Sequence, residues 1–487
     1  MDRNLVVVCL DTVRKDFFDR YATRLRANAD VSFEQCRAAS CWSVPSHASM
    51  LTGRLPSEHG ATAASPQFDA LDPGGTLRAD LPDHHFLGVS SNIYAGSAYG
   101  FDHLFDEFVD VTRDHRYPDA LDVPTYTKTA TEPGLSRYLA VLRACVGHDR
   151  PVRSLANAAA AQVDQLWDTG PFDFPAPFDD GAVSARRATV ERVREHDEPV
   201  FAFVNLMEGH EPHRDTLRYD RDLYDVPRGW RSDDLQTWDA VNPDDETTRE
   251  LQHYRDVYGA SIEYLDRQVS RFVDEVQAAT DRETTVVVTA DHGENLAFDA
   301  DDGHLGHITS LTEGVLHVPL LVFNAPDGVG MDDGSTRVET GYVSHLELPR
   351  LLAGLAAGEL PDVTAERIPA EVLAITPGND PLEAADPEYW TRRLRVVYEG
   401  DTKYEWDSLG GEYAVSLDPA DPCWQSREVL GDGTVDEGDA STAIPSWARE
   451  QFPVALDDVA LTAPAGDDDG DGVSDDVKDR LADLGYR

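Results

Sequence analysis

The sequence predicts an α/β fold class with a mostly parallel central sheet. Three short runs of apolar, largely valine-rich residues have the pattern of strands that are covered on both faces; they are Asn4–Leu10, Pro199–Leu206 and Thr284–Thr289. A long amphipathic pattern at Arg249–Thr280 lies between the last two runs and predicts a helix that covers the sheet. Strands that alternate with helices are typical of parallel sheets.

Residues that can carry chemistry follow two of these predicted strands. Asp11 comes directly after the first strand, and Asp291 and His292 follow the last one after a single alanine. The carboxyl ends of the strands in an open α/β sheet form the edge where ligands bind. A carboxylate and an imidazole that follow the same strand, next to a glycine, can form a compact metal-binding site. From the residues alone, Asp11 is either part of this site or the cap of the loop that follows it.

A short helix is predicted to end at Gly53, which tolerates a positive φ, and to begin at Pro45, whose missing N–H needs no partner there. Ser43 then lies just before the first turn, where free N–H groups attract anions. A hydroxyl held there can attack phosphorus or sulfur while those N–H groups receive the developing negative charge. The alternative is that Ser43 only caps the helix.

The motifs around this helix resemble those of a known family. Ser43-Val-Pro-Ser-His47, followed by Met-Leu-Thr-Gly, resembles the signature of the sulfatases, which belong to the alkaline-phosphatase-like superfamily of metal-assisted phosphate and sulfate ester hydrolases. The Asp-Thr-x-Arg-x-Asp run from Asp11 and the Asp-His-Gly-Glu run from Asp291 resemble two further motifs, in the family's order.

The resemblance implies a particular domain organisation. We expect an alkaline-phosphatase-like three-layer sandwich over residues 1–390, with a variable insertion at residues 110–197. A small subdomain with an antiparallel sheet is expected over residues 391–487, and it should end in a helix at residues 475–484.

The resemblance also implies a metal site and a nucleophile. Asp11, Asp291 and His292 are expected to hold one divalent cation (calcium, manganese or zinc) that also contacts the oxygen of Ser43. His292 stands where calcium sulfatases often have an amide, which favours manganese or zinc. Ser43 is expected to attack the ester.

Five further residues receive roles from the same resemblance. His210 or His307 is expected to protonate the departing alcohol, and the two could also bind a second metal ion. Contacts with the substrate are expected from three residues: Asn92, His47 and His304. Judged by the local sequence alone, each of the five is also compatible with an ordinary turn or loop residue.

Two departures from the family pattern keep the reaction open. His47 stands where sulfatases usually have arginine, and Thr12 stands where calcium sulfatases usually have a second aspartate. Sulfatases convert the first signature residue to formylglycine, and that arginine is part of what the converting system reads. The chain is therefore expected to hydrolyse sulfate esters with Ser43 or its formylglycine derivative, or phosphate mono- or diesters or phosphonate esters with unmodified Ser43. A noncatalytic binding protein on the same fold is the third alternative.

The charge of the chain excludes some partners. Asp and Glu outnumber Lys and Arg by 91 to 42, which gives a net charge of -49 spread along the whole sequence. Such a surface repels nucleic acid and anionic membranes, so we expect a small-molecule or glycan ester as the ligand and no nucleic acid. An acidic surface of this kind is typical of a halophilic, haloarchaeal-type protein, because molar salt screens its self-repulsion.

Neither a secretory signal nor an apolar run of membrane-spanning length is visible in the sequence. The five cysteines share no paired spacing, so we expect neither a disulfide framework nor a zinc finger. A cytoplasmic protein without a membrane span is therefore predicted.

Overall fold

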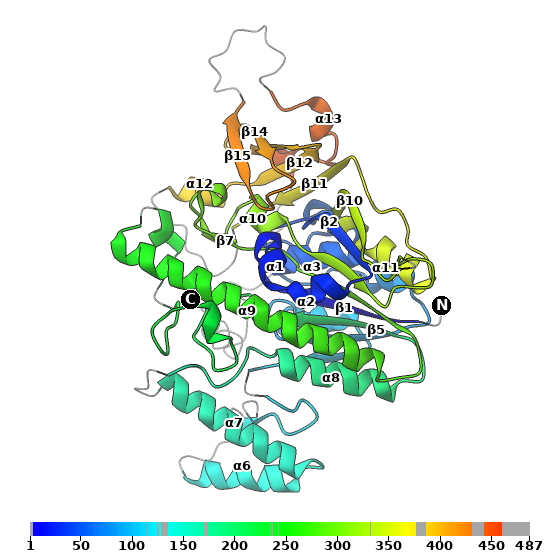
Figure 1. Ribbon diagram of the computed structural model, residues 1–487, viewed down its shortest axis with the longest axis vertical. Helices are drawn as coiled ribbons and strands as arrows, with labels where there is room; N and C mark the ends of the chain where they lie inside the picture. The colour runs from blue at the N-terminus through cyan, green and yellow to red at the C-terminus, as the bar shows by residue number, and fades with distance from the viewer. Residues whose placement is uncertain are drawn as a thin grey trace.

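The computed structural model describes residues 3–113, 115–123, 126, 127, 135–169, 174–233, 235, 237–241, 243–331, 333–375, 386–430 and 443–459. Within these residues the chain forms an eight-stranded central sheet, a five-stranded sheet and a two-stranded ribbon. Figure 1 shows the central sheet between layers of helices, with the five-stranded sheet at one end of the molecule.

The central sheet is parallel except for one strand. Only β9 runs antiparallel to its two neighbours, while the other adjacent pairs are parallel. From one edge to the other the strands are β10 (Arg337–Ser344), β2 (Val31–Arg37), β9 (Leu320–Phe323), β6 (Thr284–Thr289), β1 (Asn4–Leu10), β5 (Val200–Leu206), β3 (His85–Ser90) and β4 (Glu107–Asp110).

The three strands predicted from valine-rich runs lie side by side in the middle of this sheet. Each of β6, β1 and β5 is buried along its whole length, as expected for strands covered on both faces. The observed bounds of β1 and β6 agree with the prediction, and β5 begins one residue later. Because the three strands are parallel, the residues that follow them meet at one edge of the sheet.

Helices cover both faces of the sheet. On one face α9 (Asp245–Gln277) packs against α8 (Ala182–Glu195), α1 (Lys15–Tyr21) and α2 (Thr23–Asn28). Two helices, α3 (Ser43–Thr52) and α11 (Leu348–Ala356), pack on each other on the opposite face (Figure 1). The predicted α/β three-layer sandwich with a mostly parallel sheet is confirmed.

The expected insertion contains a helical hairpin. Its two helices are α6 (Leu135–Gly147) and α7 (Pro151–Thr169), which lie at the end of the molecule away from the five-stranded sheet (Figure 1). The remaining short elements are α4 (Pro56–His59), β7 (Asn295–Leu296), β8 (Leu305–Gly306), α10 (Glu313–Leu316), α12 (Pro387–Thr391) and α13 (Ser446–Arg449). Short 3₁₀ turns occur in the connecting loops.

The second sheet is antiparallel throughout, as predicted. Its strands follow the order of the chain and are β11 (Arg367–Val372), β12 (Leu394–Glu399), β13 (Thr402–Asp407), β14 (Glu412–Leu417) and β15 (Gln425–Val429). The sheet therefore takes its first strand from before residue 391. The domain division at that residue stays a prediction, and the helix expected at residues 475–484 lies outside the described residues.

Buried charges join the second sheet to the central one. Glu313, at the start of α10, accepts hydrogen bonds from Tyr398 of β12 at 2.6 Å and from Lys403 of β13 at 3.1 Å. The same carboxylate pairs with Arg37 of β2 at 2.8 Å. One side chain thus connects β2 with two strands of the C-terminal sheet.

All five cysteines are free and buried. Among the helices of the described residues, none has the length and apolar character needed to cross a membrane.

Candidate active site

Three ligand-type side chains converge at the carboxyl ends of β1 and β6. One donor atom from each of Asp11, Asp291 and His292 lies within 4.8 Å of the other two, and all three side chains are fully buried. Asp11 Oδ1, Asp291 Oδ2 and His292 Nε2 have no hydrogen-bond partner. Buried polar atoms are normally paired. Three unpaired acceptors at one point are therefore the arrangement that a divalent cation fits.

The other polar atoms of this group are fixed by hydrogen bonds. Asp291 Oδ1 accepts from the backbone N–H of His292 at 2.9 Å and of Thr12 at 3.3 Å. His292 Nδ1 donates to the carbonyl of Gly293 at 2.9 Å. Because Nδ1 carries the proton, the lone pair of Nε2 is available to a metal ion. Burial, and next the neighbouring His307, hold the pKa of His292 well below its usual value, which keeps the imidazole neutral.

Ser43 is linked to the carboxylate of Asp11 through one amide group. One amide nitrogen, Asn92 Nδ2, donates to Ser43 Oγ at 2.8 Å and to Asp11 Oδ2 at 2.6 Å. The predicted start of α3 at Pro45 is wrong, because the helix begins two residues earlier and Ser43 is its first residue. No side chain caps this terminus, so the alternative role of Ser43 as a cap finds no support.

His47 lies one turn further along α3 and is fully buried. Its Nδ1 donates to the carbonyl of Ser43 at 2.6 Å, and its Nε2 accepts from Asn205 Nδ2 at 3.0 Å. Both nitrogens of the imidazole are therefore paired inside the protein. The same Asn205 nitrogen donates to Asp11 Oδ2 at 3.1 Å. This placement favours a supporting role for His47, and it does not support the predicted contact with a substrate.

His210 and His307 lie next to His292. The ring of His307 is 4.6 Å from that of His292 and 5.3 Å from that of His210. Both oxygens of Glu294 are 3.3 Å from His307 Nδ1. Burial by itself would lower the pKa of His307, but the Glu294 carboxylate outweighs it and raises the pKa to about 9. A protonated imidazole thus stands beside the proposed metal ligands at neutral pH.

One known protein family matches most of this chain. The sequence model of the family described as Sulfatase matches residues 3–358 of this chain. The chain belongs to the sulfatase family. Membership assigns it to the hydrolases of sulfate or phosphate esters, a family that typically uses a divalent metal ion. A comparison with the curated proteins finds no match.

Solved structures with the same fold include several ester hydrolases. A putative sulfatase from Bacteroides thetaiotaomicron is 15% identical over 85% of each chain, with a TM-score of 0.53. The phosphonate monoester hydrolase of Agrobacterium radiobacter is 15% identical over 86% of this chain and 90% of its own, also with a TM-score of 0.53. BT4656, solved with its substrate D-glucosamine-2-N,6-O-disulfate, is 11% identical over 85% of this chain and 91% of its own, with a TM-score of 0.54. At these identities the likeness shows the fold alone.

Within this sulfatase-family chain, His304 is placed apart from the other predicted site residues. Its ring lies 4.8 Å from that of Trp390, and its Nε2 is 3.4 Å from the hydroxyl of Tyr389. Burial, and next Arg392, lower the pKa of His304 to about 3. Among the described residues, the contacts of His304 include neither the three candidate metal ligands nor Ser43. The predicted contact of His304 with a substrate therefore finds no support here.

Three residues in or next to the candidate site were missed by the sequence analysis. Asn205 had a visible signal, because it is the one polar residue of the buried β5 strand. Glu294 is the last residue of the Asp-His-Gly-Glu motif. Arg14 is buried and donates to the carbonyl of Glu294 at 2.8 Å and to Asp301 at 3.0 Å. It thereby ties the loop after β1 to the loop after β6, which no sequence pattern reveals.

The loop after β1 also depends on a close backbone approach. Thr12 has φ 59°, a conformation that β-branched residues rarely adopt, and its hydroxyl donates to the carbonyl of Gly209 at 2.5 Å. A Cβ atom at Gly209 would lie 2.6 Å from the backbone oxygen of Asp11. Glycine is therefore required at 209 to keep Asp11 in place.

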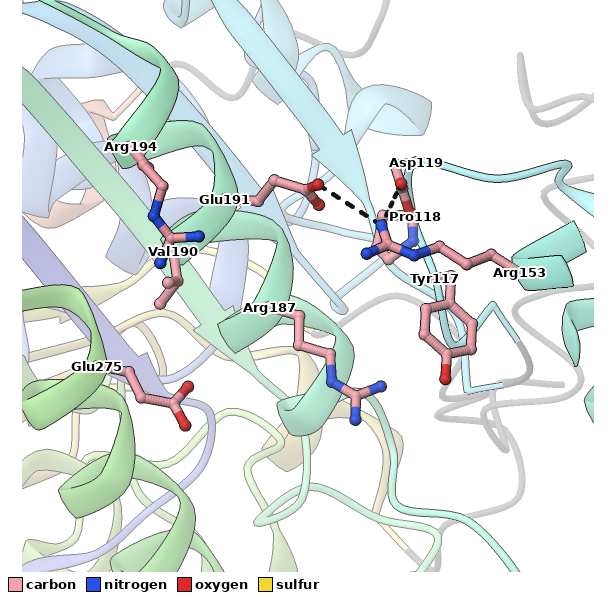
Figure 2. Close-up of a pocket in the computed structure, with 9 residues that line it drawn as sticks. All are labelled: Tyr117, Pro118, Asp119, Arg153, Arg187, Val190, Glu191, Arg194 and Glu275. Carbon is pink, nitrogen blue, oxygen red and sulfur yellow. Dashed lines mark hydrogen bonds and ion pairs between the residues drawn. The ribbon is translucent and has the colours of Figure 1, made fainter. Parts of the chain in front are cut away.

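A separate cavity of about 280 Å³ is lined by residues of α7, α8 and α9 and by Tyr117, Pro118 and Asp119 (Figure 2). It is lined by side chains of both charge signs, including Arg153, Arg187, Glu191, Arg194 and Glu275. Figure 2 shows Arg153 paired with Glu191 and Asp119 across its wall. None of the proposed active-site residues lines this cavity.

Proposed function

We propose that this chain hydrolyses sulfate esters with Ser43, or its formylglycine derivative, as the nucleophile. The observation that carries the proposal is the single amide nitrogen of Asn92, which joins Ser43 Oγ to the carboxylate of Asp11. That carboxylate is one of the three side chains whose unpaired atoms converge. Nucleophile and metal ligands thus share one buried site.

Asp11, Asp291, His292 and the oxygen of Ser43 are the proposed ligands of one divalent cation. When bound, such an ion lowers the pKa of a coordinated hydroxyl and polarises the oxygens of the ester. Because the ligand set includes an imidazole, we infer manganese or zinc rather than calcium.

The residues divide the reaction between them. Asn92 holds the oxygen of Ser43, which releases its proton to solvent water, attacks sulfur and forms the new S–O bond. The start of α3 carries the positive end of the helix dipole, which favours the negative charge that develops on the transferred group. The bond from sulfur to the departing alcohol breaks, and the alcohol oxygen takes a proton from His307 or His210. Water then hydrolyses the covalent ester and regenerates Ser43. In a formylglycine form, the hydrate attacks and sulfate leaves as the hemiacetal collapses.

The substrate is proposed to be a small-molecule or glycan ester. BT4656 has this fold and was solved with a sulfated glucosamine. Because the protein has a net charge of -49, the anionic group can bind only where local positive potential overcomes that of the surface. The start of α3 and the protonated His307 are such places in this site.

A phosphate mono- or diester, or a phosphonate ester, is the second candidate substrate. It is favoured by His47, which replaces the arginine usual in the sulfatase signature and is fully buried with both nitrogens paired. A residue in that state is a poor substitute for an arginine read by a modifying enzyme. Unmodified Ser43 would then transfer a phosphoryl or phosphonyl group.

Mass analysis of the peptide that contains Ser43 separates the two candidates. Loss of two hydrogens from Ser43 indicates formylglycine and supports the sulfatase proposal. An unmodified serine, together with faster turnover of an aryl phosphate than of the matching aryl sulfate, supports the second candidate. In either case Ser43→Ala should abolish turnover while Ser46→Ala, a change in the same helix, should not. Equal rates for Ser43→Ala and the unchanged protein would refute both.

A further inference from the structure

Three donor side chains meet at the edge of the sheet opposite the candidate active site. His85 is the first residue of β3, Glu107 is the first residue of β4, and His196 directly follows α8. The strands β3 and β4 are parallel to β5, and β5 to β1, so their first residues lie at the amino edge. A strand of six residues spans about 20 Å, which separates this cluster from Ser43 and Asp11.

One donor atom from each of the three side chains lies within 4.8 Å of the other two. Glu107 Oε2 lies 3.8 Å from His85 Nε2 and 3.5 Å from His196 Nε2. The two imidazole rings are stacked, with centroids 3.9 Å apart. Ligand atoms around a tetrahedral zinc ion with bonds of about 2.0–2.1 Å lie roughly 3.4 Å from each other. The two distances to Glu107 Oε2 are close to that spacing, and a bound ion requires the stacked rings to tilt apart, for which their partial exposure leaves room.

The hydrogen bonds of the neighbouring residues leave one atom of each side chain available to bind a metal ion. Arg192 Nε donates to Glu107 Oε1 at 2.6 Å, so Oε2 remains for another partner. His196 Nδ1 is 3.3 Å from Glu198 Oε1 and so has an acceptor of its own, while His196 Nε2 faces Glu107. His85 Nε2 is a buried atom without a hydrogen-bond partner. A carboxylate behind a metal-binding histidine is a regular feature of zinc sites.

We propose that His85, His196 and Glu107 form a second metal site, which binds zinc or a similar borderline divalent cation. Two imidazoles and one carboxylate select such ions over calcium and magnesium. The site is distinct from the catalytic one, and its ligands come from three segments that are far apart in the sequence. A bound ion would clamp the starts of β3 and β4 to the end of α8. Its role is structural, because it lies too far from Ser43 to touch a substrate.

Zinc stoichiometry tests the proposal on the full chain. Protein freed of metal by chelation is dialysed against zinc chloride in salt that screens the acidic surface, and the bound zinc is counted by mass spectrometry. The unchanged protein should bind one more zinc ion per chain than His196→Gln or Glu107→Gln. His148→Gln, which removes a histidine outside the cluster, should bind as many as the unchanged protein. Ester hydrolysis by His196→Gln should stay unchanged, so the outcome is independent of the catalytic proposal.

Two further readouts distinguish a built site from scattered surface binding. Cobalt bound at the site should give a visible absorption band that His196→Gln lacks. Glu198→Gln should keep the stoichiometry but weaken zinc binding by about tenfold to a hundredfold. Equal zinc counts in the unchanged protein, His196→Gln and Glu107→Gln would overturn the proposal. A loss of similar size in His148→Gln would overturn it as well.

Discussion

Asn92 shows how a single side chain organises the site. Its Nδ2 donates to Ser43 and Asp11, and its Oδ1 accepts from the backbone N–H of Tyr94 at 2.7 Å, which fixes the orientation of the amide. The sequence pointed to this asparagine through its position after β3 and the family motif around it. The same reasoning missed Asn205, whose only signal was its polarity within a buried strand, although the two amides converge on the same Asp11 oxygen.

Replacing Asn92 with alanine should lower kcat while the fold is retained. The change removes a hydrogen bond that orients the nucleophile, and loss of one such donor reduces kcat by about a hundredfold or more. Steady-state kinetics on an aryl ester, with melting curves for both proteins, measures the effect. Asn28→Ala on the exposed face of α2 is the control. An unchanged kcat in Asn92→Ala would show that Ser43 needs no such orientation.

At the level of helices and strands, the sequence predicted the bounds of those strands that are buried along their whole length. The central strands β1 and β6 are continuous apolar runs, and their bounds agree with the prediction. By contrast, β2 mixes buried with half-buried residues and β10 also includes exposed ones, and neither strand was predicted. The start of α3 was misplaced because proline is accepted at several positions of a first helical turn.

The sequence alone could not show which loops Arg14 joins, since that depends on the assembled sheet.

The connection between the loops after β1 and β6 can be tested through Arg14. Arg14→Gln removes the charge that faces the fully buried Asp301, and an unpaired buried carboxylate destabilises a protein by about 3–5 kcal/mol. We expect a loss of that size in urea unfolding. Arg20→Gln, an exposed change on α1, should leave the unfolding free energy nearly unaltered. A similar small effect for both variants would mean that the two loops are held together by other contacts.

For the molecule as a whole, composition and periodicity could not reveal the buried contacts that connect the two sheets. Both sheets were predicted, but not the buried group of Glu313, Arg37, Lys403 and Tyr398 that connects them. Burial by itself would raise the pKa of Glu313, but Arg37 and Lys403 outweigh it and lower the pKa to about 2.

This shift predicts how acid weakens the folded protein. A carboxylate whose pKa is lower in the folded than in the unfolded state stabilises the fold above its unfolded pKa, here near 4.5. The contribution, on the order of 3 kcal/mol, is lost as the pH falls from about 4.5 to about 2. Glu313→Gln should be less stable at pH 7, and its unfolding free energy should fall less steeply over that window. The exposed Glu359→Gln should keep the steeper fall, and identical pH profiles for all three proteins would rule out the assigned role.

The central claim is that Asp11, Asp291, His292 and Ser43 surround one cation. A crystal structure of the protein grown with manganese or zinc, with anomalous diffraction recorded at the metal edge, tests it most directly. We predict an anomalous peak within about 2.0–2.6 Å of Asp11 Oδ1, Asp291 Oδ2 and His292 Nε2, with the oxygen of residue 43 on the same ion. A well-ordered site without a peak between these atoms would contradict the account.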